Sequence, residues 1–314
     1  MKNFVKKIIL FALFIIVLAT LFQAVISLRI SGKTIYGIDN LEQASNINAD
    51  LIFLGSSRCS AQFDPRFFDS AYHLKSVNLG VDGHSEISMI ILRLKDYLSR
   101  NKPPQYAIMN FDPFMGAGSL TDNTNFVHKN VFARYAFLPK DKDLPIVDYF
   151  KFNFFERYIP LYAVFKYKLL SDCLFLPNAN KARARCYGYD EHDEQWDTVA
   201  NPVVSVEKDH FFKPSQISSI ADALDSLHHL CLINNIKLLC IQPPVYKNCQ
   251  DDFAFSATKK ICGSEGIPFI DANDESIRND ITNFYNSNHL NKYGVAKMDS
   301  LLEKDTLLAS FLRK

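Results

Sequence analysis

The sequence predicts a three-layer α/β/α sandwich with a mainly parallel five-stranded sheet, preceded by an N-terminal transmembrane helix. Three observations predict this architecture. Short apolar runs that stop at glycine or proline alternate with longer segments of helical period. A long uncharged segment stands near the N-terminus. Finally, 48% hydrophobic and 22% charged residues in a chain of 314 are enough to bury a large core.

The first element is the apolar segment Ile8–Ser27, which contains no charged residue and follows Lys2, Lys6 and Lys7. About 20 residues at 1.5 Å each match a hydrocarbon core of ~30 Å. Lysines before such a span predict a cytoplasmic N-terminus and export of everything after Arg29. We therefore expect a single-pass protein whose main domain is extracytoplasmic, either periplasmic or at the cell surface.

Two other interpretations of this segment compete with a membrane anchor. A signal peptide cut near Ala24 or Ser27 is one, but the apolar run exceeds the usual length of a signal core and no clear A-x-A site follows it. A buried helix of a soluble protein is the other, but the segment has no polar face. We favour an uncleaved anchor at 1–28, followed by a linker at 29–49.

The first half of the exported chain alternates strands and helices. The run at 50–55 is apolar and stops at glycine, which is typical of a buried parallel strand. The run at 76–80 repeats this pattern, and a third strand at 106–111 is closed by an Asp-Pro pair. Between the last two, the segment 85–99 carries isoleucine and leucine at helical spacing, which predicts a helix.

The second half resumes the alternation. It predicts a helix at 215–233, a strand at 237–242 stopped by two prolines, a helix at 252–265, a fifth strand at 267–271 and a final helix at 292–312. Strands that alternate with amphipathic helices require right-handed crossovers, which give a parallel sheet covered by helices on both faces.

The alternation lapses between residues 113 and 214, inside a domain expected to span 50–314. About a hundred residues cannot form a simple loop, so this insertion is expected to carry its own helices and to pack beside the sheet or against a partner. It is rich in aromatic residues, which are expected mainly to fill a core, with a membrane-facing patch as the alternative. They are Phe150, Phe152, Phe154, Phe155, Tyr158, Tyr162, Phe165 and Tyr167.

Residues that follow the strands are the candidates for chemistry, because ligands of open α/β sheets bind at the carboxyl ends of the strands. Ser57 follows the first strand on a tight turn, and Gly80 follows the second. Asn110 and Asp112 follow the third. His289 precedes the final helix. The order of these residues, rather than any one of them, points to nucleophilic catalysis by a serine with a histidine base.

These residues resemble the sequence blocks of the SGNH/GDSL hydrolase superfamily. Gly55-Ser56-Ser57 resembles the first block, Asn78-Leu79-Gly80 the second, and Asn110 or Asp112 falls where the third has its asparagine. His289-Leu290-Asn291, followed by Gly294, resembles the ending of membrane-anchored, extracytoplasmic members. Those members include the proteins of alginate O-acetylation and teichoic-acid D-alanylation, which work beside membrane-bound O-acyltransferases.

The resemblance implies an SGNH fold over about 50–112 and 215–308. It implies Ser57 as the nucleophile, His289 as the base and the amides of Ser57 and Gly80 as oxyanion donors. The superfamily has aspartate three residues before the histidine, whereas this chain has Asn286. An amide orients the imidazole but does not stabilise imidazolium as a carboxylate does. Asp271, Asp274 or Asp280 are candidates to compensate in space.

Three functions remain open at this point. The first is a serine esterase or O-acyltransferase acting on acyl esters of a cell-envelope glycan, with the insertion as a lid that excludes water. The second is a non-catalytic partner or scaffold of a membrane-bound O-acyltransferase, which Asn286 favours. The third is an anchored α/β protein of another family.

Charge and cysteine content argue against nucleic-acid binding, a disulfide scaffold and a metal site. The chain has 35 Lys and Arg against 34 Asp and Glu, so it lacks the basic surplus that nucleic acid binding requires. Seven cysteines form no recognisable disulfide scaffold, although Cys173 with Cys186, or Cys249 with Cys262, are alternative pairs, and Cys59 or Cys240 would suit a free thiol. Neither the acidic segment 190–194 nor the adjacent histidines 228 and 229 have zinc-ligand spacing, and no metal or cofactor is expected.

Overall fold

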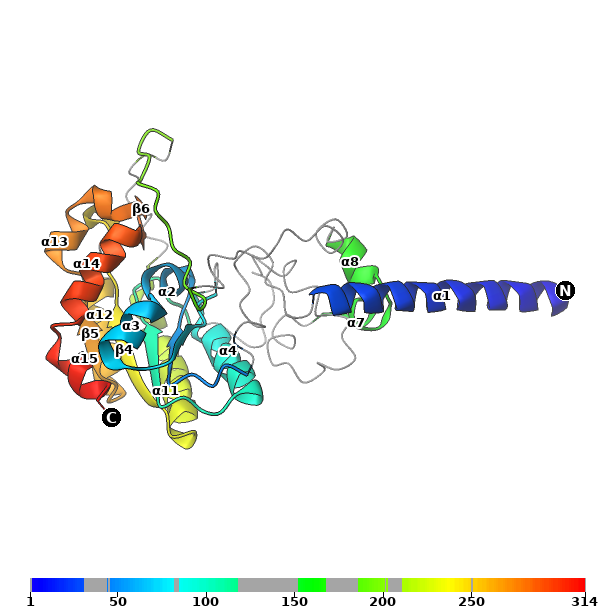
Figure 1. Cartoon of the computed structure of the whole chain (residues 1–314), viewed down its shortest axis with the longest axis horizontal. Coiled ribbons are helices and arrows are strands. Elements are labelled where there is room, and N and C mark those ends of the chain that lie inside the picture. The colour runs from blue at the N-terminus through cyan, green and yellow to red at the C-terminus, as the bar shows by residue number, and fades with distance from the viewer. Residues whose placement is uncertain are drawn as a thin grey trace.

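The structure is a computed structural model. It describes residues 2–30, 44, 46–81, 85–117, 152–167, 186–200, 202, 211–249 and 251–313. For residues 27–30 it describes the backbone alone. Figure 1 shows these elements along the chain.

The centre of the fold is a parallel sheet of five strands, as expected. The strands are β1 (Leu51–Leu54), β2 (Ser76–Asn78), β3 (Tyr106–Asn110), β4 (Lys237–Gln242) and β5 (Phe269–Asp271). Their order is β2-β1-β3-β4-β5, and each neighbouring pair is parallel. Each expected strand lies within one or two residues of its observed bounds, because the apolar runs are buried on both faces of the sheet.

One face of the sheet is covered by three helices, α4 (Ile87–Arg100), α11 (Ile217–Ile233) and α12 (Asp252–Ser264). Side chains alternate along a strand, so Ile52 and Leu54 of β1 point to this side and belong to one continuous hydrophobic cluster with these helices. The three helices lie where the sequence period predicts them.

The opposite face is covered by α2 (Ser57–Gln62), α3 (Pro65–Tyr72), α14 (Lys292–Leu302) and α15 (Thr306–Phe311). Phe53 points to this side and belongs to a second hydrophobic cluster that includes residues of all four helices. Helices on both faces of a parallel sheet make the three-layer α/β/α architecture.

The C-terminal region differs from the expectation of one helix at 292–312. Helix α14 ends at Leu302, and Asp305 begins α15 by accepting a hydrogen bond from the Leu308 amide. Aspartate favours such an N-cap position, which explains the break. Smaller elements that the periodicity did not indicate are α13 (Glu275–Arg278), η3 (Pro214–Gln216), η4 (Lys247–Cys249), η5 (Ile281–Asn283), β6 (Phe284–Asn286) and β7 (His289–Leu290).

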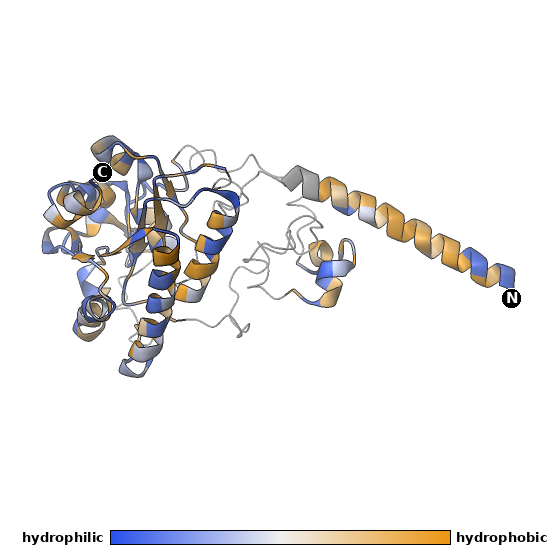
Figure 2. Ribbon diagram, turned by 90° about the horizontal axis from the view of Figure 1, so that it is seen from below, coloured by the Kyte–Doolittle hydropathy of each residue, from blue (hydrophilic) through white to orange (hydrophobic). Residues whose placement is uncertain are grey.

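The N-terminal segment forms one helix, α1 (Lys2–Ile30). Its part Lys2–Ile26 is long and apolar enough to cross a membrane. From Phe4 to Val25 its large apolar side chains face outward, and Figure 2 shows the coloured part of this helix as mostly hydrophobic.

Two short helices of the insertion are described, α7 (Phe154–Tyr158) and α8 (Tyr162–Lys166). The aromatic residues here were expected mainly to fill a core, and this expectation is wrong for five of them: Phe154, Phe155, Tyr158, Tyr162 and Phe165 are exposed. Phe152 is buried. Phe150 and most of segment 113–214 lie outside the described residues.

The cysteines that the structure describes are buried. Cys262 carries a free thiol, so the alternative pair of Cys249 with Cys262 is not formed. Cys240, one of the two residues expected to suit a free thiol, is also free. Cys173 lies outside the described residues.

Candidate active site

Ser57 stands at the first position of α2, directly after β1. The turn between them is tight: a Cβ added to Gly55 would lie 2.7 Å from Cys59 Cβ and 2.9 Å from Asn110 Cβ. Ser56 caps the helix by accepting a hydrogen bond from the Arg58 amide. Between residues 51 and 63, Ser57 alone is not buried, so the turn presents a single side chain to solvent.

His289 and Asn286 face each other across the β6–β7 hairpin, in which Asn286 pairs with His289. Asn286 Oδ1 accepts hydrogen bonds from the backbone amides of Asn288 and His289, both at 3.0 Å. These bonds close the turn in the manner of an Asx-turn. Asn286 therefore shapes the loop that carries the histidine.

The three side chains form a chain of hydrogen bonds. His289 Nε2 lies 2.9 Å from Ser57 Oγ, and His289 Nδ1 lies 2.9 Å from Asn286 Oδ1. Because Asn286 Oδ1 already accepts two backbone amides, this atom is the oxygen of the carboxamide. Nδ1 must then carry the proton, which leaves Nε2 as the acceptor for the Ser57 hydroxyl.

Burial, together with the positive charges of Arg58 and His192, lowers the pKa of His289 to about 3. The ring of Tyr285 stacks between these two histidines, with its centroid 4.0 Å from that of His192 and 5.3 Å from that of His289. His289 is therefore neutral at physiological pH and free to accept a proton, but weakly basic.

The three aspartates proposed to compensate for Asn286 are engaged elsewhere. Asp271 Oδ1 accepts from Gln242 Nε2 and from the Asn273 amide. Asp274 caps α13 and Asp280 caps η5. Asn286 is thus the residue that orients the imidazole.

Gly80 lies close to the turn that carries Ser57. A Cβ at this position would lie 2.6 Å from the Ser60 amide nitrogen and 2.8 Å from the Ser56 carbonyl oxygen, so glycine permits the turn to approach β2 closely. Its amide donates to Asn78 Oδ1 at 2.9 Å. An oxyanion role for this amide stays a prediction and requires that hydrogen bond to be exchanged. The Ser57 amide belongs to the first turn of α2, where amides have no acceptor within the helix.

Asn110 and Asp112 are buried at the end of β3, and their side chains bond each other, Arg58 and the Phe114 amide rather than Ser57 or His289. Asn110 Nδ2 donates to Asp112 Oδ2 at 3.0 Å. Asp112 also accepts from the Phe114 amide and forms an ion pair with Arg58 at 2.7 Å. The structure therefore places both residues in a buried network with Arg58.

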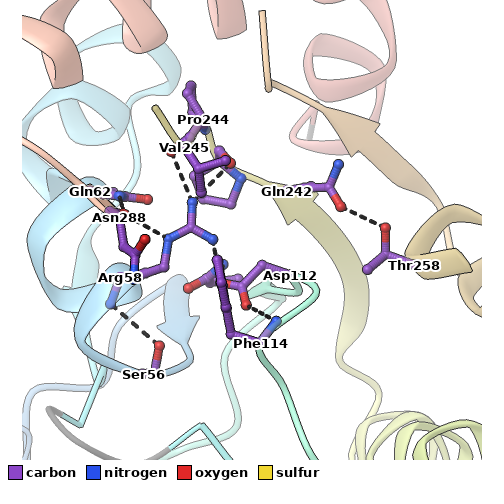
Figure 3. Close-up of polar contacts among 12 residues, drawn as sticks. Ser56, Arg58, Gln62, Asp112, Phe114, Gln242, Pro244, Val245, Thr258 and Asn288 are labelled. Atoms are coloured by element: carbon purple, nitrogen blue, oxygen red, sulfur yellow. Dashed lines mark hydrogen bonds and ion pairs between the residues drawn. The ribbon is translucent and has the colours of Figure 1, made fainter. Parts of the chain in front are cut away.

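Arg58 is the residue whose importance the sequence did not reveal. Its Nε donates to the Asn288 carbonyl oxygen at 2.9 Å, and its Nη2 donates to the carbonyl oxygens of Pro243 and Pro244 at 2.9 Å each. Its Nη1 pairs with Asp112. Figure 3 shows the guanidinium at the centre of these contacts. One side chain thus ties the serine-bearing helix to the histidine-bearing loop and to the end of β4.

A second tie acts on the same loop. Gln62 Nε2 donates to the Asn288 carbonyl oxygen at 3.0 Å. Both donors lie on α2, so the helix that begins at Ser57 holds the backbone next to His289 through two side chains. The signal in the sequence was the presence of Arg58 and Gln62 in a short segment expected to be buried. Buried polar side chains require hydrogen-bond partners, so these two residues indicated contacts with another part of the chain.

No group of three or more His, Cys, Asp or Glu side chains within the described ranges is placed to hold a metal ion. In the acidic segment, His192 contacts Asp190 and Glu194, while Glu191 forms an ion pair with Arg66. Glu191, Asp193 and Glu194 are exposed and the segment contains no helix or strand, so it is a solvated loop that the Glu191–Arg66 ion pair joins to the domain.

Comparison with known proteins adds little to this geometry. No family model matches the chain, and no curated protein matches it. Among solved structures, the crystal structure of a "putative acylhydrolase" from Bacteroides fragilis NCTC 9343 aligns with 84% of this chain and 88% of its own, with 12% sequence identity and a TM-score of 0.36. A likeness at that level does not carry an assignment of function.

Proposed function

We propose that the protein is a serine-dependent acyl-transfer enzyme, either an esterase or an O-acyltransferase, with Ser57 as nucleophile and His289 as base. The observation that carries this proposal is the hydrogen-bond chain from Ser57 Oγ through His289 to Asn286 Oδ1, with 2.9 Å at each step. A serine activated by a neighbouring, oriented imidazole is the arrangement that acyl transfer uses on many folds.

The chemistry follows from the protonation states. Ser57 Oγ attacks the carbonyl carbon of an acyl ester while its proton passes to His289 Nε2. The imidazolium then donates this proton to the oxygen of the leaving alcohol as the ester bond breaks. Water or an acceptor hydroxyl, deprotonated by the same nitrogen, then attacks the acyl-serine. The imidazolium returns its proton to Ser57 Oγ as the acyl–serine bond breaks, which releases the acid or the new ester and regenerates the free enzyme. The Ser57 amide, with Gly80 if its present bond opens, would donate to the oxyanion.

The finer proposal is that the acyl ester belongs to a cell-envelope glycan and that the domain works outside the cytoplasm beside a membrane-bound O-acyltransferase. The apolar helix α1, preceded by three lysines, supports the location. The resemblance of the sequence around Ser57 and His289 to anchored members of the SGNH/GDSL superfamily supports the substrate class.

A fluorophosphonate probe tests the reaction class. Attack by Ser57 Oγ on phosphorus displaces fluoride and leaves a stable adduct, without any need for the natural substrate. We expect the wild-type chain to be labelled, Ser57→Ala and His289→Ala to be unlabelled, and Ser300→Ala, which changes an exposed serine on α14, to be labelled as wild type. Release of acetate from an acetyl ester, with and without an added polyol, then separates hydrolysis from transfer.

A second candidate function is a non-catalytic scaffold that has kept the fold. Asn286 in the position of a carboxylate and the low pKa of His289 favour it, because both leave the imidazolium poorly stabilised. The same probe decides between the two: if no form of a folded chain is labelled, the enzyme proposal fails and the scaffold stands.

A further inference from the structure

Helices α7 and α8 of the insertion lie beside the C-terminal part of α1 (Figures 1 and 2). Ala163 and Val164 of α8 are buried, as are Gln23 and Ile26 of α1. These four side chains belong to neither of the two hydrophobic clusters that hold the α/β domain together. The helix pair therefore packs as an attachment to the apolar helix rather than as part of the sandwich.

One hydrogen bond fixes the depth of this attachment. The Leu161 amide, in the turn between α7 and α8, donates to Gln23 Oε1 at 2.8 Å. Gln23 lies four residues before Ser27, the end of the apolar run, which is about 6 Å at 1.5 Å per residue. The turn thus stands level with the last turn of the apolar segment, where the edge of a bilayer would lie.

The bond also satisfies a backbone group that needs a partner. Leu161 has a left-handed backbone with φ of 65°, outside the helix, so its amide has no helical acceptor. An amide without an acceptor is costly in an apolar medium. Gln23 is 2% exposed and supplies that acceptor from inside an otherwise apolar stretch of α1.

The outer face of the helix pair is aromatic. Rings of α7 and α8 contact one another in pairs, with centroid separations of 5.0 to 5.8 Å. These four residues and the nearby Phe165 remain at least 38% exposed, and the set is Phe154, Phe155, Tyr158, Tyr162 and Phe165. We call this set the aromatic face. Clustered aromatic side chains are typical of membrane–water interfaces.

The charged residues of α7 and α8 are compatible with a membrane–water interface. Glu156 is the only acidic residue in 152–167, and its side chain is fully buried. It pairs with Lys166 Nζ at 2.6 Å, accepts from Tyr167 Oη at 2.7 Å and bonds the Asn153 amide. The described part of this helix pair therefore presents no acidic side chain outward, and nothing on it repels an anionic headgroup.

From these observations we propose that α7 and α8 form an interfacial foot that lies in the outer headgroup region of the membrane, with the aromatic face against lipid. The occupant is lipid because the foot is bonded to the apolar helix at the level of its last turn, so inserting α1 into a bilayer brings the aromatic face to the interface. The proposal rests on the proposed membrane anchoring, and it does not depend on catalysis.

Depth-dependent fluorescence quenching of the full chain in lipid vesicles tests the foot. Trp196, the single tryptophan, is first replaced by phenylalanine. Phe155→Trp or Phe165→Trp then places one reporter on the aromatic face, and Phe253→Trp, at an exposed position of α12, is the matched control. Vesicles of zwitterionic and anionic lipid carry bromine either near the headgroup or near the methyl end of the acyl chain.

We expect both foot reporters to be quenched severalfold more than the Phe253→Trp reporter, and more by bromine near the headgroup than by bromine near the methyl end. Flotation of each variant with the vesicles checks anchoring separately, and fluorophosphonate labelling of Ser57 checks the domain. A chain that floats with the vesicles but shows unquenched foot reporters overturns the proposal and assigns the aromatic face to a protein partner. A chain that does not float overturns the anchoring and the foot together, while the labelling result still judges the enzyme.

Discussion

Asn286 serves two purposes that are usually separated. Its carboxamide oxygen closes the turn by accepting from two backbone amides, and the same oxygen orients His289 by accepting from Nδ1. An aspartate would serve the turn equally well, since it offers the same acceptor. Unlike an aspartate, Asn286 places no negative charge beside His289. Burial and Arg58 already lower the pKa of this imidazole.

Replacing Asn286 with aspartate is expected to accelerate the reaction. A carboxylate stabilises the imidazolium, and the reverse change in serine proteases costs roughly 10⁴ in kcat, so we expect fluorophosphonate labelling to speed up by a factor between about 10 and 10⁴. The carboxylate also raises the pKa of His289. The rate of wild-type labelling should stay flat as pH falls until it nears 3, whereas the Asn286→Asp rate should fall at a higher pH. A slower Asn286→Asp variant with an unchanged profile would contradict this.

Arg58 is expected to position the site and to depress the basicity of His289. Arg58→Gln removes the charge and leaves Asp112 unpaired, which should cost about 3–5 kcal/mol of stability and move the acid limb of the labelling profile to higher pH. Arg58→Lys keeps the charge, so its acid limb should stay in place while the labelling rate falls because one ammonium cannot bond Asn288, Asp112 and the two prolines together.

The matched control for Arg58 is Arg93, which forms another buried ion pair, with Asp96 on α4. Arg93→Gln should lower the melting temperature in a similar way without shifting the acid limb. If all three variants shift the limb equally, the effect is one of general unfolding and the positioning role is refuted.

The role of a single residue was predictable where it depends on neighbouring sequence, and it was not predictable where it depends on distant contacts. Ser57 and His289 were found because each follows or precedes an element whose pattern the sequence shows, and the hydrogen bond of 2.9 Å joins them. The role of Arg58 was not predictable. Its partners stand 54, 185, 186 and 230 positions away, and only the folded chain brings them to one point.

Among the elements, α14 carries a buried carboxyl group that works against the fold at high pH. Burial, with a smaller contribution from Asp64, raises the pKa of Asp299 to about 8, while Arg66 opposes the shift. The folded state therefore holds a proton that the unfolded chain releases near pH 4. The stabilisation linked to this proton is complete below pH 4 and is lost as the pH rises towards 8.

Asp299→Asn is expected to raise the melting temperature at pH 8 and to change it little at pH 5. We expect the removal of this buried ionisable group to raise the free energy of unfolding at pH 8 by about 1–2 kcal/mol. In a chain of this size, each kcal/mol raises the melting temperature by roughly 2–4 °C. Scanning fluorimetry of the full chain in one detergent measures it. Asp274→Asn, an exposed cap whose amide replacement still accepts from the Ser276 amide, is the control and should change little at either pH. Equal shifts for the two variants would exclude the burial argument.

Elements with a strong period were predicted well, and short ones were not. The five strands and helices α4, α11 and α12 follow from apolar periodicity. The hairpin of β6 and β7, which carries Asn286 and His289, has strands of three and two residues and is held by side-chain bonds to the turn. Such bonds leave no period in the sequence, so the geometry of the site was hidden even where its residues were recognised.

At the scale of the whole molecule, the α/β/α sandwich follows from the alternation of strands and helices, and the structure confirms it. The attachment of α7 and α8 to α1 does not follow, because it depends on one glutamine within an apolar run and on a turn 138 positions later. The sequence indicated aromatic content but not the side of the molecule on which the rings emerge.

The orientation of the chain makes a prediction at this scale. If Lys2, Lys6 and Lys7 keep the N-terminus in the cytoplasm, protease added outside right-side-out spheroplasts should digest the α/β domain, and the domain in inverted vesicles should survive. Immunoblots against an N-terminal tag, which should be protected in the first case and digested in the second, measure this. If the domain is digested only in inverted vesicles, the predicted orientation is wrong and the domain lies in the cytoplasm.

The 232 positions between Ser57 and His289 have a consequence for a chain that is exported as proposed. Translocation proceeds from the amino end, so the serine reaches the outside long before the imidazole that activates it. A chain that ends before His289 exposes a serine hydroxyl without its imidazole partner. If Ser57 and His289 act as proposed, acyl chemistry begins only after His289 has also crossed the membrane, and no separate inhibitor is needed during export.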